Sequence, residues 1–564
     1  MKKYFSLLAC LLLVVFVLTS FAACANDGEE YDELVVYNWA DYIFKYEEDF
    51  AKKNEGYYYR MTGRNIKITY VTFDTNETML TRLTQGDSNV DVVCPSEYAI
   101  QKLIESNKLL PLNYFNKTEY RKGLKMLPEV DFDAFFNGGE TDANGKIVDT
   151  GNIESEIINK ISAAETFGEL TINATGETVS MADYLVPYMY GTLGILYNKT
   201  EFEKLGITAE KMNKANWGIL FNDDGEGGIL SDGLSGNILM KDSIRDSYAA
   251  TIFYLYERGK LNGLTDENGR PYTDYTANEL INVVDDQVLE LVGDALVKQK
   301  SQLFGYEVDF GKDDLLQGNA IVDLAWSGDA MYAVEESDGE LAYYVPHTMG
   351  NIWFDGWVIP TTCNPDHLSA AKIFINYLNR PKSAAANILE IGYTAAVKAD
   401  LLFNDDSEGG ARSVLCEGYC VYAPEYWDVV DEKGKPIAKE DCDFESWEAF
   451  AEYFFNYYDE VDGSNWRYPF KVNEEIIAGV PARTLSNLGV MQDFGSSNKK
   501  VVTMWNYARS AGSSGEALAL LGWTALAVAV AVGALFLVIL IKRLLAQSVK
   551  VGRVSDEQET PLAA

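Results

Sequence analysis

Short apolar runs alternate with stretches of helical apolar spacing along most of the chain. Five runs bounded by polar residues are typical of buried strands. They cover residues 34–37, 66–71, 90–93, 238–240 and 320–325. Residues 283–297 and 371–378 carry apolar side chains three and four positions apart, as amphipathic helices do. We therefore predict an α/β protein whose largely parallel sheets are covered by helices on both faces.

Aromatic and acidic side chains follow several of these predicted strands. They are Trp39, Asp41 and Tyr42 after the first run, Ser96 and Tyr98 after the third, Trp326 and Asp329 after the fifth, and Trp353 and Asp355 in a further segment of the same pattern. In parallel sheets, ligands bind beyond the carboxyl ends of the strands. Carboxylates accept strong hydrogen bonds from ammonium groups, and aromatic faces attract cations. The pattern therefore favours an alkylammonium ligand.

The first residues have the features of a secretion signal. Lys2 and Lys3 precede an uncharged apolar run to Leu18, and small residues then lead to Cys24. A cysteine in this place is similar to the bacterial lipobox, in which the cysteine carries the lipid anchor. We predict that residues 1–23 are a signal peptide and that Cys24 is lipidated; the alternative is an ordinary cleaved signal.

Residues 517–541 contain no charged side chain, and about 20 apolar residues suffice to cross a bilayer as a helix. Lys542 and Arg543 follow at once, and such clusters stay on the cytoplasmic side. We predict a C-terminal transmembrane helix, a cytoplasmic tail at 542–564, and a body on the extracytoplasmic face. The alternative is a buried helix of a soluble domain.

The chain is strongly acidic, with 85 acidic residues against 47 basic ones and a formal net charge of −38. Nucleic-acid binding needs clustered Lys and Arg, so this composition argues against it. A cationic ligand is the natural complement. A solvated acidic surface without a cationic partner explains the charge equally well, so composition alone does not decide.

Cysteine and histidine usage bears on disulfides and metals. Beyond the signal, the cysteines are Cys94, Cys363, Cys416, Cys420 and Cys442. Outside the cytoplasm disulfides are allowed, and we expect one bridge among the last three, with its pairing open. Zinc is the rival interpretation, but the only histidines are His347 and His367, both far from this group in sequence. We predict no metal site, no cofactor and no catalytic residues.

Eight short motifs lie in order along the chain: 37–42 (YNWADY), 75–79 (TNETM), 95–98 (PSEY), 187–191 (PYMYG), 242–246 (DSIRD), 326–328 (WSG), 353–355 (WFD) and 391–393 (IGY). With these motifs in this order, the chain resembles the spermidine/putrescine-binding proteins of bacterial ABC importers. Each is weak alone, and their common order carries the resemblance. It implies a polyamine ligand, and a permease and an ATPase as partners.

The resemblance also implies a two-lobed periplasmic-binding-protein fold with the ligand in a cleft between the lobes. We expect one lobe at 33–182 with 355–400, the other at 183–354 with 481–510, and an acidic aromatic insertion at 401–480. Further insertions relative to the family lie near 138–180 and 222–236.

Carried over position by position, the resemblance assigns ligand contacts. Expected walls are Trp39, Tyr42, Trp326, Trp353 and Tyr393; expected polar neighbours are Ser96, Tyr98 and Gln492; expected amine-binding acids are Asp41, Asp246 and Asp355. Asp329 stands where putrescine binders carry an acid, which points toward a short diamine. Ala40 and Ser243 depart from the family and remove polar groups that some members offer.

Structural roles compete with these assignments. Single tryptophans often belong to the core. Asp246 follows Ser243 at a spacing typical of a helix start, and Asp355 precedes a glycine as turn acids do. Two other functions stay open: the same fold binding another organic cation or solute, and a surface-anchored glycoside hydrolase, whose clefts also pair acids with aromatic rings. No hydrolase motif is present, so we predict a binding protein rather than an enzyme.

Overall fold

The computed structural model describes residues 31–85, 89–163, 166–167, 169–337, 340–407, 409–415, 458–459, 465–466 and 487–511. The predictions for Cys24, for the three clustered cysteines, for 517–541 and for 542–564 concern residues outside these ranges, and most of 401–480 lies outside them too. Within the described ranges, no helix is long and apolar enough to span a bilayer.

The first sheet is fully parallel, in the order β2-β1-β3. Its strands are β1 (Tyr31–Trp39), β2 (Asn65–Phe73) and β3 (Val92–Val93). Leu34 and Val36 of β1 are fully buried, as expected for a strand between two helical layers. Helix α15 (Leu368–Leu378), from much later in the chain, packs against β1. Three predicted strands and one predicted helix are thereby confirmed.

The second sheet is mixed rather than parallel. Its main order is β11-β10-β12-β9-β14-β19, and β13 and β16 also pair with β9. The strands are β9 (Val186–Asn198), β10 (Ile238–Lys241), β11 (Leu303–Glu307), β12 (Val322–Trp326), β13 (Leu341–Tyr344), β14 (Gly350–Trp357), β16 (Thr394–Ala395) and β19 (Leu488–Gly489). Strand β9 runs antiparallel to β12, β13, β14 and β16. The prediction of largely parallel sheets is therefore wrong for this half, although β10 and β12 lie where predicted.

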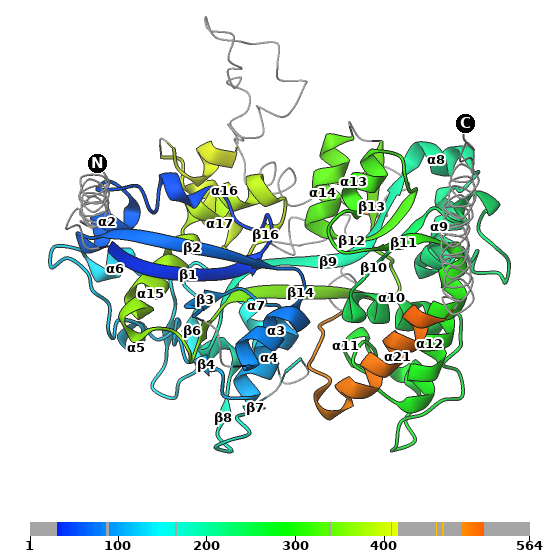
Figure 1. Cartoon of the computed structure of the whole chain (residues 1–564), viewed down its shortest axis with the longest axis horizontal. Helices are drawn as coiled ribbons and strands as arrows, with labels where there is room; N and C mark the ends of the chain where they lie inside the picture. The colour runs from blue at the N-terminus through cyan, green and yellow to red at the C-terminus, as the bar shows by residue number, and fades with distance from the viewer. Residues whose placement is uncertain are drawn as a thin grey trace, which may run out of the picture.

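Strands β9 and β14 extend from the second sheet toward the first (Figure 1). The carboxyl end of β14 meets the segment after β3 through two isolated bridges, Ser96 with Asp355 and Val93 with Val358. Residues that follow strands of both sheets thus come close together. The lobe boundaries drawn from the sequence stay a prediction.

Helices that follow the strands of the second sheet bring further polar residues to its edge. They are α10 (Ile244–Glu257), α13 (Gly311–Leu316) and α14 (Ser327–Glu336). At the start of α10 the Ser243 side chain accepts a hydrogen bond from Asp246 N at 3.4 Å, so the predicted cap is present. Near the first sheet, α3 (Asn76–Thr84) and α4 (Glu97–Glu105) likewise follow strands and carry polar residues at their starts.

Other elements complete the layers. The predicted helix at 283–297 is α12 (Asp286–Gln299), which packs against α21 (Asn498–Ser510). Shorter helices are α2 (Tyr57–Thr62), α5 (Lys117–Tyr120), α6 (Phe132–Phe135), α7 (Ser155–Ser162), α8 (Lys199–Lys204), α9 (Ala209–Ala215), α11 (Ala277–Leu280), α16 (Pro381–Ile391) and α17 (Ala399–Asn404). Short strands are β4 (Leu109–Leu110) with β15 (Ile359–Pro360), β5 (Glu140–Thr141) with β6 (Ile147–Asp149), β7 (Leu170–Thr171) with β8 (Thr178–Val179), and β17 (Tyr458–Asp459) with β18 (Asn465–Trp466). The β5/β6 and β7/β8 hairpins fall in the insertion predicted at 138–180.

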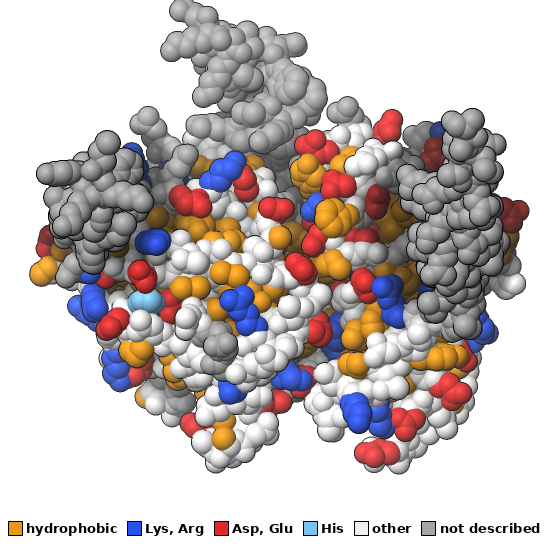
Figure 2. All heavy atoms as spheres, in the orientation of Figure 1, with side chains coloured by type: hydrophobic (Ala, Val, Ile, Leu, Met, Phe, Trp, Pro, Cys, Tyr) orange, Lys and Arg blue, Asp and Glu red, His pale blue; other side chains and the backbone are white. Residues whose placement is uncertain are grey.

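Acidic and basic side chains are interspersed on the face seen in Figure 2, with no large patch of one sign.

Candidate functional site

A cavity of about 520 Å³ lies where the segments after the strands of both sheets meet. Eleven of the twelve residues predicted from the sequence to bind ligand line it: Trp39, Asp41, Tyr42, Ser96, Tyr98, Asp246, Trp326, Asp329, Trp353, Asp355 and Tyr393. Further acids line it as well, namely Asp74, Glu77, Glu97, Asp309, Asp313 and Glu390, against two bases, Arg245 and Lys312. The volume suits a small organic molecule, and acidic side chains far outnumber basic ones around it.

Aromatic rings form the walls and hold one another in place. The Tyr393 ring lies edge-on to both Trp353 and Tyr42, with each centroid distance 5.3 Å. Trp39 packs on Phe73 at 4.5 Å, and its Nε1 donates to Cys94 O at 2.9 Å. Such packing fixes ring orientation before a ligand arrives.

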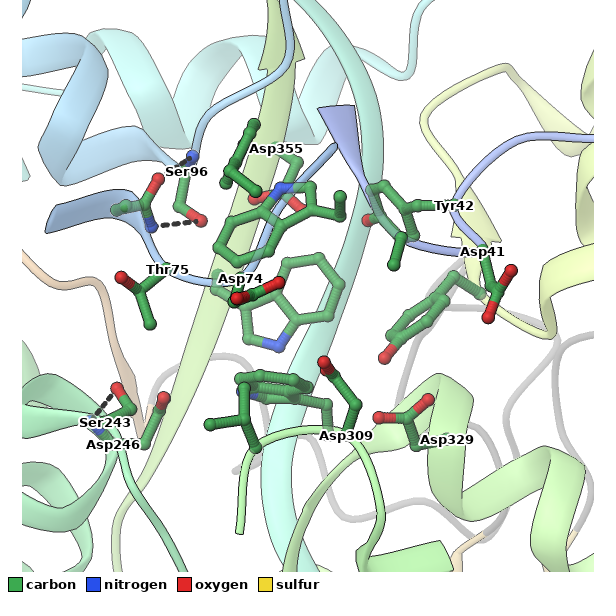
Figure 3. A pocket seen from close by; sticks show the side chains of 18 of the residues that line it. Asp41, Tyr42, Asp74, Thr75, Ser96, Ser243, Asp246, Asp309, Asp329 and Asp355 are labelled. Atoms are coloured by element: carbon green, nitrogen blue, oxygen red, sulfur yellow. Dashed lines mark hydrogen bonds between the residues drawn. The ribbon is translucent and has the colours of Figure 1, made fainter. Parts of the chain in front are cut away.

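Asp355 is a buried carboxylate at the end of β14. Burial raises the pKa of Asp355 to about 7, opposed by the hydroxyls of Ser96 and Tyr42, while the Asp246 charge raises it further. Its Oδ1 makes no hydrogen bond within the described structure. Figure 3 shows Asp355 and Ser96 at one side of the cavity. An ammonium group would supply the missing donor and favour the ionised form.

Ser96 is held in place by Asn76, the first residue of α3. The amide of Asn76 donates to Ser96 Oγ at 3.0 Å and accepts from Ser96 N at 3.2 Å. Because Ser96 Oγ accepts from Asn76, its own proton remains free to be donated toward Asp355. The 75–79 motif, which reads as a helix start, therefore also orients a cavity residue.

Glu97 is a site residue that the sequence reasoning missed. It is almost fully buried, and its Oε2 accepts a hydrogen bond from Phe354 N at 2.9 Å. Its Oε1 has no partner within the described residues. Burial raises the pKa of Glu97 to about 8. The available signal was its place in the 95–98 motif, directly after a buried strand.

The edge of the cavity near α10 combines acids with a buried arginine. The Tyr98 hydroxyl donates to Glu77 Oε1 at 3.2 Å, and the Arg245 guanidinium lies 4.9 Å from the centre of the Tyr98 ring. Burial raises the pKa of Asp246 and of Glu77. Arg245 donates to Gln492 O at 2.6 Å, but its Nε makes no hydrogen bond within the described structure.

Asp329 lines the cavity but is paired with a lysine. Its Oδ1 lies 2.8 Å from Lys312 Nζ on α13. Asp309 lies beside it (Figure 3), and burial together with the Asp329 charge raises the pKa of Asp309. Sequence reasoning named Asp329 but missed Lys312, because nothing in the spacing links 312 to 329.

Two predicted residues differ from the rest. Asp41 lines the cavity but is exposed and adopts a positive φ of 48°. Gln492 does not line it: its amide nitrogen donates to Thr166 O, and the neighbouring Met491 lines the cavity instead. No group of three or more His, Cys, Asp or Glu side chains suited to a metal ion occurs in the described part of the chain.

A family model described as "Bacterial extracellular solute-binding protein" matches residues 45–405, more than half of the 564-residue chain. The chain belongs to this family. It therefore has an α/β periplasmic-binding-protein fold. It is the extracellular solute-binding component of an ABC transporter, and this family is not enzymatic.

Curated relatives are similar over two thirds of this chain. The putrescine-binding periplasmic protein of Escherichia coli (strain K12) is 22% identical over 376 residues, which are 66% of this chain and 79% of the relative. The spermidine/putrescine-binding periplasmic protein of Salmonella typhimurium is 23% identical over 374 residues, again 66% and 79%. The putrescine/agmatine-binding protein of Pseudomonas aeruginosa is 22% identical over 396 residues, 69% and 85%.

Solved structures match this chain at low similarity. The spermidine/putrescine ABC transporter substrate-binding protein of Streptococcus pneumoniae has 21% identity and a TM-score of 0.46, covering 85% of this chain and 99% of that one. The Tp0655 lipoprotein of Treponema pallidum has 15% identity and a TM-score of 0.47 over the same shares. At these TM-scores the likeness carries no conclusion about the ligand.

Proposed function

We propose that this solute-binding protein captures a polyamine, spermidine or putrescine, and delivers it to a permease and ATPase for import. In this proposal Cys24 carries a lipid and 517–541 spans the membrane, so that the protein stays anchored beside its permease on the extracytoplasmic side.

The observation that carries the polyamine proposal is the set of unpaired buried acceptors at the cavity. Asp355 Oδ1 and Glu97 Oε1 are both buried without a hydrogen-bond donor in the described structure. Leaving such atoms unpaired is costly. An ammonium group offers three donors and a positive charge, which satisfy both the geometry and the electrostatics.

The aromatic walls support the same chemistry. Trp39, Trp326, Trp353 and Tyr393 line the cavity together with the acids. Their rings provide apolar surface for methylene groups and negative faces for ammonium groups. A ligand with charged ends and a hydrocarbon middle uses both features. The relatives named after putrescine and spermidine point the same way.

We also propose that the two sheets belong to lobes that close over the ligand. Contacts join α4 to the segment after β19: Lys102 Nζ lies 3.0 Å from Asp493 Oδ1, and Asp493 N donates to Gln101 Oε1 at 2.8 Å. The proposed boundaries are those expected from the sequence, 33–182 with 355–400 and 183–354 with 481–510.

A second candidate is an amine that also carries a carboxylate, such as a basic amino acid. The observation that favours it is the unpaired Nε of Arg245 at the cavity edge. A guanidinium binds carboxylates well. The surplus of acids nevertheless makes a purely cationic ligand the better match.

A ligand screen by thermal shift on the full-length protein tests both candidates. Putrescine, cadaverine, spermidine, lysine, arginine, a monosaccharide set and divalent metals would be compared at equal ionic strength. We expect the polyamines alone to raise the melting temperature. A shift with lysine or arginine but not with polyamines would select the second candidate, and a shift with sugars alone would reject both.

A further inference from the structure

One side of the cavity already contains an ammonium group that belongs to the protein. Lys312, the second residue of α13, bonds Asp329 Oδ1 at 2.8 Å, and both residues line the cavity. Their side chains are only 24% and 15% exposed. Figure 3 shows Asp329 beside Asp309, on the opposite side of the cavity from Asp355.

The pair is favourable as it stands. Burial opposes the positive charge of Lys312, but the carboxylate of Asp329 outweighs this, so that the pKa of Lys312 is raised. The other lysine near this side cannot take over the role. Lys241 is fully buried, ion-paired with Glu307 at 2.5 Å and bonded to Val308 O at 2.6 Å.

A lysine side chain is chemically a butylammonium, the equivalent of one end of a four-carbon diamine. It makes the same charge-assisted hydrogen bond to a carboxylate that a ligand ammonium would make. Two ammonium groups at one buried carboxylate repel each other where screening is weak. A ligand that reaches Asp329 must therefore displace Lys312 or tolerate this repulsion.

We propose that Lys312 occupies the ammonium position at Asp329 and so sets the length of ligand that the cavity accepts. This inference rests on the proposed polyamine function. Asp355 and Asp246 are two other carboxylates of the cavity, and they interact with each other electrostatically. A diamine that reaches these two is accepted, whereas a triamine, whose third ammonium must extend toward Asp329, meets Lys312.

The test compares putrescine and spermidine affinities of the full-length protein and of Lys312→Met by calorimetry. Methionine keeps a similar unbranched stem but removes the charge. We expect the parent to bind putrescine more tightly than spermidine. In Lys312→Met the spermidine-to-putrescine affinity ratio should rise at least tenfold, because Asp329 becomes available to a third ammonium group.

Two further variants distinguish this explanation from a general change in the cavity. Lys312→Met combined with Asp329→Asn should lose most of the gain for spermidine, since the freed acid is then absent. Lys500→Met, which breaks an exposed pair with Asp286 outside the cavity, should leave the ratio unchanged. Thermal unfolding of each variant checks that the fold is intact.

The outcomes distinguish the role of Lys312 from the proposed polyamine binding. A parent that binds putrescine, together with a Lys312→Met ratio within twofold of the parent's, would overturn the role of Lys312 and leave the polyamine function standing. An equal gain in the double variant would overturn it too. A parent that binds neither amine would reject the proposed function itself.

Discussion

Ser96 and Asp355 face each other in a β-bridge that joins the segment after β3 to the end of β14. The bridge places a hydroxyl from the first sheet beside a buried carboxylate from the second. A ligand ammonium at Asp355 therefore also lies near the Ser96 hydroxyl, which opposes the raised pKa of this carboxyl. Both residues fall in the same proposed lobe, 33–182 with 355–400, so the bridge holds this part of the cavity together within one lobe.

Asp355→Asn tests whether this carboxylate holds an ammonium group. The substitution keeps the shape and removes the charge. Binding of the preferred polyamine should weaken by about 2 to 4 kcal/mol, on the order of 30- to 1000-fold. Calorimetry on the full-length protein measures the effect.

The matched control is Asp286→Asn, which removes an exposed acid paired with Lys500 outside the cavity. It should leave the affinity unchanged. The fold should survive Asp355→Asn, and the unliganded variant should be no less stable near pH 8, because it no longer contains a buried charge. Tight binding by Asp355→Asn would mean that the ligand charge is bound elsewhere.

Ligand affinity should rise with pH between about 6 and 8. The pKa of Asp355 is about 7 and that of Glu97 about 8 in the empty cavity, so an ammonium ligand must displace their protons at lower pH. Alkylammonium groups resemble the lysine side chain, whose pKa is about 10.4, so the ligand stays charged over this whole pH range. Asp355 alone accounts for about a tenfold loss of affinity from pH 8 to pH 6.

Calorimetry in buffers of different ionisation enthalpy checks this prediction, since binding at pH 7 should release protons. Asp355→Asn should show a weaker pH dependence. The sign for stability is opposite: both pKa values are raised above those of unfolded carboxyls, so the unliganded protein gains stability from these groups at low pH. It loses that stability as the pH rises from about 4, where unfolded carboxyls lose their protons, to the folded pKa values of about 7 and about 8. An affinity that is flat with pH would contradict the involvement of Asp355.

Residues at or just after strand ends could be predicted as cavity residues from the sequence, and residues on helices only where a short motif or the family resemblance marked them. Trp39 and Trp326 were predicted because buried apolar runs mark where strands end, whereas Asp355 was predicted from the aromatic and acidic pattern of its segment and from the family resemblance. Lys312 lies within a helix that carries no such mark, so only the folded chain brings it to Asp329. Local sequence therefore predicts which segments surround the cavity, whereas long-range contacts decide which acids are free.

The direction of the strands could not be predicted from the sequence either. The apolar run of β9 is compatible with either direction, because periodicity reports burial and not orientation. The structure places it antiparallel to its neighbours. Gln492 illustrates the same limit: its segment lies beside the cavity through Met491, but its side chain turns to Thr166 O.

Membrane topology can be tested on intact cells. If 517–541 spans the membrane with Lys542 and Arg543 inside, added protease should remove the body and spare an epitope tag at the C-terminus. Truncation before Glu516 should leave the protein membrane-bound, and Cys24→Ser combined with that truncation should release it. Protection of both body and tag would contradict the predicted orientation.

The buried ammonium group of Lys241 should contribute strongly to the stability of the fold. Its ammonium group pairs with Glu307, donates to Val308 O and lies 4.3 Å from the centre of the Trp326 ring. Asp323 is also fully buried close by, and burial raises its pKa, as does the Glu307 charge, while the Lys241 charge lowers it. Lys241→Met therefore leaves two buried carboxylates without their cation.

We expect Lys241→Met to lower the free energy of unfolding by about 3 to 5 kcal/mol. Lys500→Met, which breaks an exposed pair, should cost no more than about 1 kcal/mol. The deficit of Lys241→Met should shrink at low pH, where the orphaned acids bind protons. Urea unfolding at pH 5 and pH 8 measures both effects. A deficit that is small or the same at both pH values would show that Glu307 and Asp323 do not depend on the charge of Lys241.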